Sequence, residues 1–255
     1  MVLQGRQAGM RKSHLNLKKL TDLTVSQAYP TVRPMSLFNF GPNKSRNLTS
    51  EGIENPPRHR PPLVGVVLAA GRGSRFDPSG RRSKLTQAVD GVPMLGMTIS
   101  SLSEVLDEVI VVLRDDRHRH ELEQLTDIFG AKSVLCPDAS SGMGHSLAWG
   151  ISYVNAHYNC TGVLITLGDM PYVSTRSVTQ LAGQIRKPSD IAALRFDGRI
   201  GHPVGFGSDY FASLGRLTGD QGAKKILEQH KTVMIDTHDA GVLQDIDSPS
   251  DIRSD

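Results

Sequence analysis

The chain has 255 residues, of which 38% are hydrophobic and 5% aromatic, with 25 glycines and 14 prolines. This length supports one sizeable core with or without a tail, and the composition favours an α/β protein over an all-β sandwich. The net charge of +3 is unevenly spread, since residues 1–62 carry +7 and the remainder −4, which argues against a basic nucleic-acid-binding domain.

Residues 1–62 show no sustained periodicity and end in a proline-rich stretch that begins at Pro56. We predict a disordered basic extension over 1–62 and one folded domain over 63–255. Three explanations stay open for the extension: a natural tail, an organellar targeting segment, or an initiation codon assigned too far upstream.

From residue 63 onward, short apolar runs rich in β-branched residues alternate with segments of helical spacing. The apolar runs predict strands at 63–69, 109–113, 133–136, 162–167, 191–194 and 232–235. The periodic segments predict helices at 93–103, 118–129, 144–156, 174–185 and 222–229, and residues 201–206 look like a turn and a short strand. This alternation predicts a Rossmann-like, doubly wound α/β fold with a mostly parallel sheet.

The two cysteines, Cys136 and Cys160, are too few for a disulfide framework and lack metal-ligand spacing. Each adjoins an apolar run, which indicates reduced, buried thiols in a cytoplasmic protein. No apolar run approaches the roughly 18 residues that a membrane-spanning helix needs, so we expect no membrane contact.

The first predicted strand runs into a glycine-rich turn, Leu68-Ala69-Ala70-Gly71-Arg72-Gly73-Ser74-Arg75-Phe76. Glycines allow close backbone approach and positive φ, and successive N–H groups in such a turn bind phosphate oxygens. Arg75 and Lys84 supply positive charge for a triphosphate. The turn is neither a Rossmann fingerprint nor a Walker A loop, and a plain strand-to-helix connection is the alternative.

Asp169 follows the strongly apolar run 162–167, at the sheet edge where open α/β folds bind ligands. A carboxylate there can coordinate Mg²⁺ that bridges a triphosphate. The alternative is a helix cap, for which Ser174 and Thr175 are better placed.

The candidates for a second carboxylate ligand of the metal are Asp220 and Asp247. Asp220 is the predicted ligand, although it is equally suited to cap the helix that starts near Gly222. Asp247 alternatively serves only to shape the C-terminal turn. A basic cluster at 114–120 is interpreted as a solvated helix start.

The string from Leu68 to Phe76, with a lysine beyond it, resembles the signature of the MobA/MocA-like NTP transferases, which are related to molybdenum cofactor biosynthesis. The resemblance continues in order along the chain, and its Ala-Ala-Gly, His-Pro and Gly-Asp-x-Gly-Ala elements look like the cytidylyltransferase branch. The later elements are Pro137-Asp138, Gly142-Met143-Gly144-His145-Ser146-Leu147, Leu167-Gly168-Asp169-Met170-Pro171, Gly201-His202-Pro203, Gly219-Asp220-Gln221-Gly222-Ala223 and Asp245-Ile246-Asp247-Ser248-Pro249.

The resemblance implies the fold of the nucleotide-diphospho-sugar transferases and an enzyme of the EC 2.7.7 class. The implied reaction moves a nucleotidyl group from an NTP, with CTP favoured, to a phosphorylated small molecule, with molybdopterin favoured, and releases pyrophosphate. Mg²⁺ is the implied cofactor, and a molybdenum enzyme or its chaperone is an implied partner. Two alternatives stay open: another small-molecule or sugar-phosphate acceptor, and a non-catalytic nucleotide-binding accessory protein.

The resemblance also implies roles for individual residues. Arg75, Lys84 and Asp169 are the expected catalytic residues. The expected nucleotide contacts are Leu68, Ala69, Ala70, Gly71, Gly73, Ser74, Arg75, Lys84, Gly142, Met143 and Gly144. The last three belong to the segment that, with Pro137-Asp138, resembles the family's base-recognition turn. The expected metal ligands are Asp169 and Asp220, and His202 and Pro203 are expected on the acceptor side.

The chain departs from the family in the spacing between Arg75 and Lys84, which is longer than usual. The extra residues form an extended loop, 76–83, that contains Arg81 and Arg82. These arginines either touch an anionic substrate or lie in solvent.

Overall fold

The computed structural model describes residues 62–252, so the predicted extension lies outside the described residues except for Pro62. The strands are β1 (Leu63–Leu68), β2 (Ala88–Val89), β3 (Val92–Pro93), β4 (Glu108–Arg114), β5 (Lys132–Cys136), β6 (Gly162–Leu167), β7 (Ile191–Phe196), β8 (Arg199–Gly207) and β9 (Val233–Asp236). The helices are α2 (Met94–Ser103), α3 (Arg119–Ile128), α4 (Met143–His157), α5 (Thr175–Ala182), α6 (Phe211–Leu214) and α7 (Lys224–Gln229). Short 3₁₀ helices are η2 (Lys84–Thr86), η3 (Ala139–Ser141), η4 (Ser208–Tyr210), η5 (Ala240–Leu243) and η6 (Pro249–Asp251).

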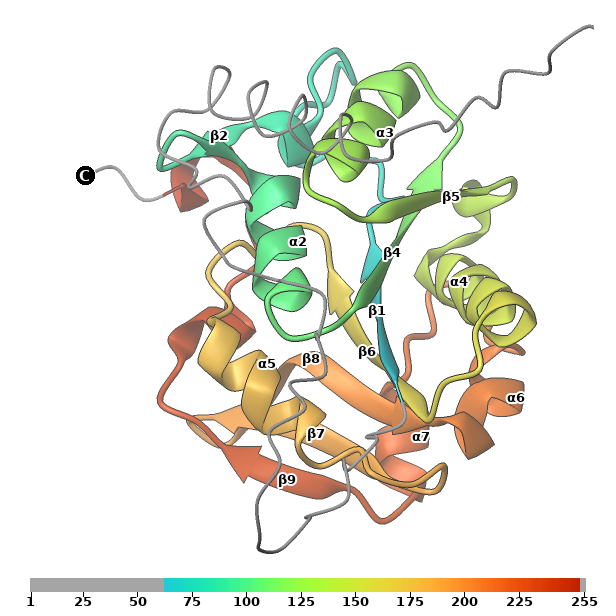
Figure 1. Cartoon of the computed structure of the whole chain (residues 1–255). Coiled ribbons are helices and arrows are strands. Elements are labelled where there is room, and N and C mark those ends of the chain that lie inside the picture. Colours follow the sequence, from blue (N-terminus) through green and yellow to red (C-terminus); the bar gives the residue numbers. More distant parts are fainter. Residues whose placement is uncertain (1–61, 253–255) are drawn as a thin grey trace, which may run out of the picture. The chain divides into compact units, whose positions relative to one another are not determined.

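Seven strands form one sheet in the order β5-β4-β1-β6-β8-β7-β9, while β2 and β3 form a separate hairpin (Figure 1). The pairs β4–β5, β1–β4, β1–β6 and β7–β9 are parallel, and only β8 runs antiparallel to its neighbours in this sheet. The predicted mostly parallel sheet is therefore confirmed.

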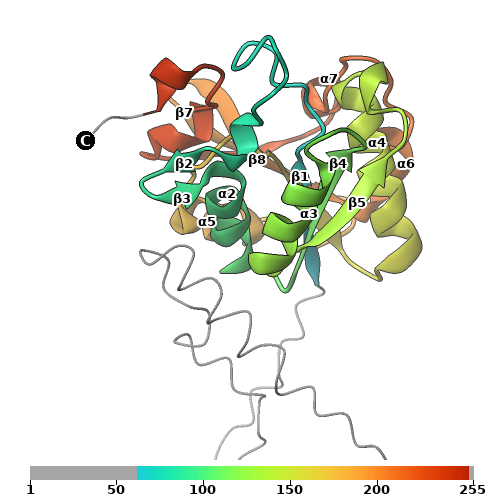
Figure 2. The ribbon, with the colours of Figure 1, turned by 90° about the horizontal axis from the view of Figure 1, so that it is seen from above.

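Helices cover both faces of the sheet, as a doubly wound fold requires (Figures 1 and 2). One layer contains α2, α3 and α5, and the other contains α4, α6 and α7. On the second face, Val66, Ile110 and Ile165 from adjacent strands join one buried cluster with Leu147 and Ile151 of α4. Burying such side chains contributes about 1.5–3 kcal/mol each, which explains why β1, β4 and β6 are continuous apolar runs.

The segment from Gly201 to Phe206 differs from its prediction as a turn and a short strand. It belongs to β8, a nine-residue strand inserted between β6 and β7. The turn lies earlier, at Asp197 and Gly198, where both residues have positive φ. Because the last five residues of β8 are buried, sheet pairing and covering helices decide this segment's structure.

The extended loop 76–83 is folded around the carboxylate of Asp77. Its Oδ1 accepts hydrogen bonds from the backbone N–H of Ser79 at 2.9 Å and from the Ser79 hydroxyl at 2.6 Å. Its Oδ2 accepts one from the backbone N–H of Arg82 at 2.8 Å. The Ser79 hydroxyl and these N–H groups lower the pKa of Asp77 to about 2. At the loop's tip, the Gly80 carbonyl accepts a bond from His118 Nε2 at 3.0 Å.

Both cysteines are free thiols. Cys136 is buried as predicted, whereas Cys160 is only half-buried. Burial is the main cause that raises the pKa of each thiol, which keeps both protonated near neutral pH.

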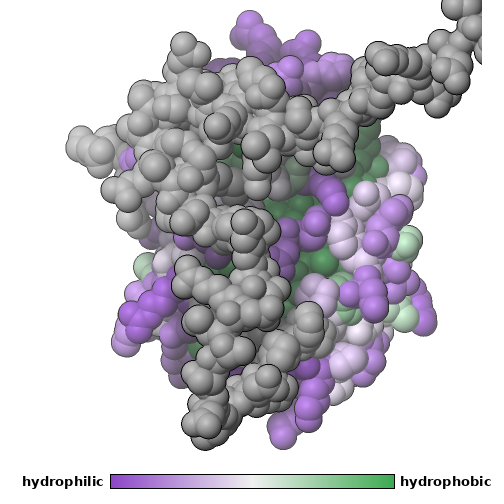
Figure 3. All heavy atoms as spheres, viewed as in Figure 1, coloured by the Kyte–Doolittle hydropathy of each residue, from purple (hydrophilic) through white to green (hydrophobic). Residues whose placement is uncertain are grey.

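Most of the surface that is coloured by hydropathy in Figure 3 is formed by hydrophilic residues. Among the described residues, the exposed large apolar side chains are Met143, Trp149, Ile200, Val233 and Met234. None of the helices between residues 62 and 252 has the length and apolarity needed to span a bilayer.

The contact between α2 and the end of α3 gives a stability prediction. A Cβ atom on Gly96 would lie 2.4 Å from the ring of buried Phe129. Overpacking costs about 1–3 kcal/mol and is partly offset by the higher helix propensity of alanine, ~1 kcal/mol. We expect Gly96→Ala to lower the free energy of unfolding by about 1 kcal/mol in urea titration. Gly183→Ala, whose Cβ would lie no closer than 3.3 Å to a neighbour, is the control, and equal stability of the two variants would contradict the prediction.

The order of the extended loop gives a second prediction. The pKa of Asp77 in the folded protein is lower than its ordinary value. The stabilisation that the ionised Asp77 carboxylate gives to the loop is therefore complete above about pH 4 and is lost as the pH falls through about 2. We expect hydrogen exchange at the Ser79 and Arg82 amides to stay protected between pH 7 and 5. Asp77→Asn should lose this protection at both pH values. Retained protection in that variant would show that other contacts order the loop.

Candidate active site

A cavity of about 430 Å³ opens at the carboxyl ends of the central parallel strands. Its walls include Leu68 at the end of β1, Arg114 at the end of β4 and Leu167 at the end of β6. It brings together most of the predicted site residues: Leu68, Ala69, Ala70, Gly71, Gly73, Ser74, Arg75, Lys84, Gly142, Met143, Asp169 and Asp220. Gly144, His202 and Pro203 are not among the lining residues.

The glycine-rich turn presents free backbone donors to this cavity. Among the described residues, no hydrogen-bond acceptor lies in reach of the N–H groups of residues 71–75. The space around Gly71 is open, and Gly73 has a φ of +62° with the stem of Lys84 3.6 Å from where a Cβ would stand. Successive unpaired N–H groups form an anion-binding concavity.

Lys84 lies beneath the turn and is held by three oxygen atoms. Its Nζ donates to Asp169 Oδ2 at 2.5 Å, to the Ile246 carbonyl at 3.1 Å and to Asp247 Oδ1 at 3.2 Å. The Lys84 and Asp169 side chains are 12% and 16% exposed, so solvent screens this ion pair only weakly.

Asp247, the alternative to Asp220 as a second carboxylate ligand, lies at the Lys84 ammonium. Besides Lys84, it forms an ion pair with Arg75 from the glycine-rich turn. The C-terminal segment is fixed at this position because the Ile246 N–H donates to the Asp169 carbonyl at 3.0 Å. Asp251 forms a capping box with Ser248 at η6, and its Oδ2 also accepts a hydrogen bond from the Asp247 N–H.

Asp169 has the features of a metal ligand. Its Oδ1 atom is buried and accepts no hydrogen bond from the described residues. It does not cap α5, because that role belongs to Ser174, whose side chain accepts from the Ser177 N–H. A buried acceptor without a partner is costly, and coordination of a hard cation such as Mg²⁺ would satisfy it.

Within residues 62–252 there is no cluster of three or more histidine, cysteine or acidic side chains suited to a metal ion. Mg²⁺ does not require such a cluster, because one or two carboxylates usually bind it while water and substrate phosphates fill its remaining positions. The oxygens around Lys84 Nζ provide two such carboxylates, Asp169 and Asp247.

Asp220 lies at another wall of the cavity, against Gly142. It does not cap α7, because that helix begins at Lys224 and has Ala223 at its N-cap without a side-chain cap. No described contact joins Asp220 to Asp169 or Lys84. Its predicted metal role stays a prediction.

His202 lies within β8 rather than in a turn, and its Nδ1 is 3.4 Å from the Ile165 carbonyl. A carbonyl only accepts, so Nδ1 holds the proton and Nε2 keeps its lone pair in the neutral ring. Burial lowers the pKa of His202, and the Ile165 carbonyl, Asp169 and Asp245 oppose this only in part. The acceptor-side role of His202 and Pro203 stays a prediction.

The basic cluster at 114–120 was interpreted as a solvated helix start, and the structure corrects this in part. Arg114 and His118 line the cavity, with Arg114 lying 3.7 Å from Asp116. Arg119 fits the interpretation, since it pairs with Glu123 and Asp115 outside the lining.

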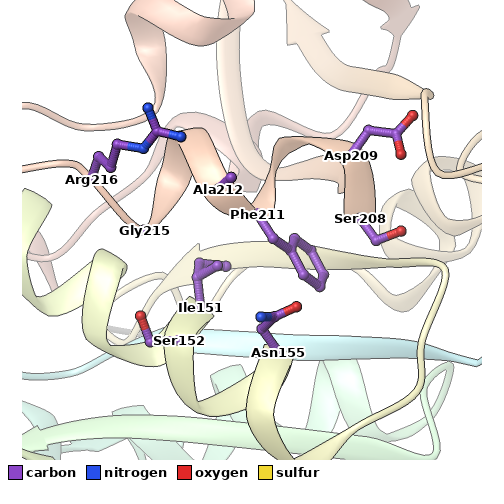
Figure 4. A pocket seen from close by; sticks show the side chains of 9 residues that line it. All are labelled: Ile151, Ser152, Asn155, Ser208, Asp209, Phe211, Ala212, Gly215 and Arg216. Atoms are coloured by element: carbon purple, nitrogen blue, oxygen red, sulfur yellow. The ribbon is translucent and has the colours of Figure 1, made fainter.

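A second, more open hollow of about 410 Å³ lies between α4 and α6 (Figure 4). Its lining is Ile151, Ser152, Asn155, Ser208, Asp209, Phe211, Ala212, Gly215 and Arg216. In Figure 4, the Phe211 ring points toward α4 and the charged ends of Asp209 and Arg216 point apart. This hollow therefore lacks the converging charged groups of the larger cavity.

Comparison with known proteins agrees with this geometry. The chain matches the model of the MobA-like NTP transferase domain over residues 65–233. It is 29% identical over 202 residues to the purine catabolism protein PucB of Bacillus subtilis (strain 168), covering 75% of this chain and 94% of PucB.

Two solved proteins share the fold. Rv0371c from Mycobacterium tuberculosis H37Rv is 26% identical with a TM-score of 0.65, covering 75% of this chain and 95% of that one. Its structure in complex with manganese has 26% identity and a TM-score of 0.61, covering 74% and 95%. A nucleotidyl transferase from Methanothermobacter, Mth528, has 22% identity and a TM-score of 0.63, covering 74% and 93%.

The family match spans more than half of the chain and includes the glycine-rich turn, Lys84 and Asp169. The fold shared with Rv0371c covers 75% of the chain. The chain therefore belongs to the MobA-like NTP transferase family and is a nucleotidyltransferase.

Proposed function

We propose that the chain transfers a cytidylyl group from CTP to molybdopterin and releases pyrophosphate. The observation that supports transfer most directly is the Lys84–Asp169 pair beneath a turn with free N–H donors. CTP and molybdopterin are favoured because the Ala-Ala-Gly, His-Pro and Gly-Asp-x-Gly-Ala elements resemble the cytidylyltransferase branch of the family.

In this reaction an acceptor phosphate oxygen attacks the α-phosphorus in line. The new P–O bond forms as the bond between the α-phosphorus and the bridging oxygen breaks, and that oxygen leaves with pyrophosphate. The protein's part is positioning and charge neutralisation. The N–H groups of residues 71–75 and the Arg75 guanidinium bind the β- and γ-phosphates, while Lys84 neutralises charge at the α-phosphate.

Asp169 and Asp247 would hold Mg²⁺, which supplies charge neutralisation and orientation of the triphosphate when bound. The contacts favour Asp247 over Asp220 as the second ligand, because Asp247 shares the Lys84 ammonium with Asp169. Manganese in the related Rv0371c structure supports a divalent cation in this family.

The acceptor and later partners follow from the same proposal. An anionic pterin phosphate would enter beside the triphosphate, and a molybdenum enzyme or its chaperone would receive the product. We place the reaction in the cytoplasm, which the two free thiols support.

Pyrophosphate release tests this function directly. Purified protein with Mg²⁺ should release pyrophosphate from CTP only when molybdopterin is present, and less from GTP, UTP or ATP. Release with a sugar phosphate instead would favour a different acceptor. Absence of release with every triphosphate and molybdopterin would contradict the proposal.

The role of Asp169 gives a prediction about the metal. Asp169→Asn keeps the shape of the side chain but removes its charge, so we expect kcat to fall by about 10²-fold or more. The apparent affinity for Mg²⁺, obtained from the rate at varied Mg²⁺ concentration, should fall as well. Asp209→Asn, in the hollow between α4 and α6, is the control. Unchanged metal dependence in Asp169→Asn would remove Asp169 from the metal site.

The position of Lys84 gives a separate prediction. Its ammonium neutralises Asp169 and Asp247, so Lys84→Met leaves Asp169 without a cation and Asp247 with Arg75 alone. We expect transfer to be lost but Mn²⁺ binding without nucleotide, followed by electron paramagnetic resonance of free Mn²⁺, to tighten about tenfold or more. Lys187→Met, which removes a charge outside the cavity, should bind Mn²⁺ as the wild type does. Weaker binding in Lys84→Met would exclude this competition between ammonium and metal.

A further inference from the structure

The Asp220 carboxylate faces the cavity without a partner. Among residues 62–252, no cation and no hydrogen-bond donor contacts it. Of the other carboxylates that line the cavity, Asp169 and Asp247 pair with Lys84 and Asp116 pairs with Arg114. Asp245 has no such pair within the described residues, but it adjoins Ile246, whose carbonyl accepts from Lys84 Nζ at the opposite side of the cavity. An ionised carboxylate only accepts hydrogen bonds, so this wall of the cavity is suited to a ligand group with N–H or O–H donors.

Asp220 is held there by two backbone segments that pack directly on each other. The Gly144 N–H donates to the Gly219 carbonyl at 2.8 Å. A Cβ on Gly142 would lie 2.3 Å from the Gly219 carbonyl carbon and 2.7 Å from Asp220 Oδ1. A Cβ on Gly144 would lie 2.4 Å from the Gln221 carbonyl oxygen. The glycines of the turn thus allow a contact that fixes Asp220 at its edge.

This wall lies away from the cations. Gly142 follows β5, whereas Asp169 and its partner Lys84 lie at the end of β6. In the order β5-β4-β1-β6 the two strands are three spacings apart, or about 14 Å. A triphosphate belongs beside Lys84 and Arg75, since the Asp220 carboxylate repels it, and the uncharged nucleoside end then reaches toward β5.

We propose that Asp220 accepts a hydrogen bond from the exocyclic amino group of the donor's base, and so selects amino-bearing bases over their oxo counterparts. The inference rests on the proposed function, because it assumes a nucleoside triphosphate in this cavity. Cytosine offers an N–H donor at the position where uracil has a carbonyl oxygen. Asp220 is exposed without a ligand, so its carboxylate is then solvated. A base seated over it excludes that water, and two acceptors facing each other there would both lack a partner, which polar sites reject.

The neighbours of Asp220 fit a base rather than a phosphate. Met143 is 42% exposed at the cavity wall and offers an apolar surface to a flat ring. Asp138, the other acidic side chain near this turn, is 3.9 Å from His145 Nε2 and does not line the cavity. Among the carboxylates that line the cavity without an ion pair, Asp220 is the one beside this turn, since Asp245 adjoins Ile246 at the Lys84 contact.

Two ligand pairs isolate the amino group: CTP with UTP, and ATP with ITP. Dissociation constants measured by calorimetry with Mg²⁺ need no acceptor and no turnover. In at least one pair, wild-type protein should bind the amino-bearing triphosphate roughly 10- to 100-fold more tightly than its partner. Asp220→Asn should reduce that ratio to within about threefold, because an amide accepts from an amino group and donates to a carbonyl.

Two further variants separate this role from others. Asp138→Asn tests the neighbouring carboxylate, and Asp209→Asn tests a charge change remote from the cavity. Both should keep the wild-type ratio. The thermal midpoints of all variants without ligand verify that each is folded, and Asp220→Ala, which should weaken binding of the amino-bearing triphosphate alone, provides a second substitution.

The outcomes are distinct. Loss of discrimination in Asp220→Asn alone supports the inference. Equal weakening of both members of a pair would place Asp220 at the ribose or the metal and overturn it, as would a ratio that responds to Asp138→Asn instead. If wild-type protein binds triphosphates without discrimination, the inference fails while the proposed nucleotidyl transfer itself stands. If it binds none of them, both fail.

Discussion

The rest of the site depends on the hydrogen bonds that the Lys84 ammonium donates. The oxygens around it come from distant parts of the chain: Asp169 follows β6, while Ile246 and Asp247 belong to the C-terminal segment. Since these groups are largely shielded from water, removing one partner would leave a poorly solvated charge, which is strongly destabilising. The contacts of Lys84 therefore fix three segments of the chain relative to one another before any ligand binds.

Two glycine-rich turns border the same cavity and use glycine for opposite purposes. Gly71 has open space where a side chain would stand, so the backbone around it is accessible to a ligand. Gly142 and Gly144 have protein backbone there instead, and the absence of a Cβ lets residues 218–221 pack against them. One turn is thus suited to a ligand, and the other builds a wall of the cavity.

Sequence predicted those features that local patterns determine. Continuous apolar runs located β1 and β6 because strands buried on both faces need apolar side chains throughout. The register of β8 could not be predicted, because an antiparallel strand between β6 and β7 follows from distant pairing. The contact between Asp247 and Lys84 could not be predicted for the same reason, since 163 positions separate the two residues. For the conformation of the extended loop 76–83, the only local indication in the sequence was a short run of turn-forming residues.

The charges of the cavity explain why metal and nucleotide belong together in the proposed reaction. In the structure, Lys84 and Arg75 neutralise Asp169 and Asp247. A triphosphate that takes both cations would leave two carboxylates facing each other, and a divalent cation without a triphosphate would compete with the Lys84 ammonium for the same oxygens. When both ligands are present, the phosphates pair with Lys84 and Arg75 while the carboxylates pair with the metal. This exchange gives each of these four side chains a partner of opposite charge, so binding of each ligand favours binding of the other.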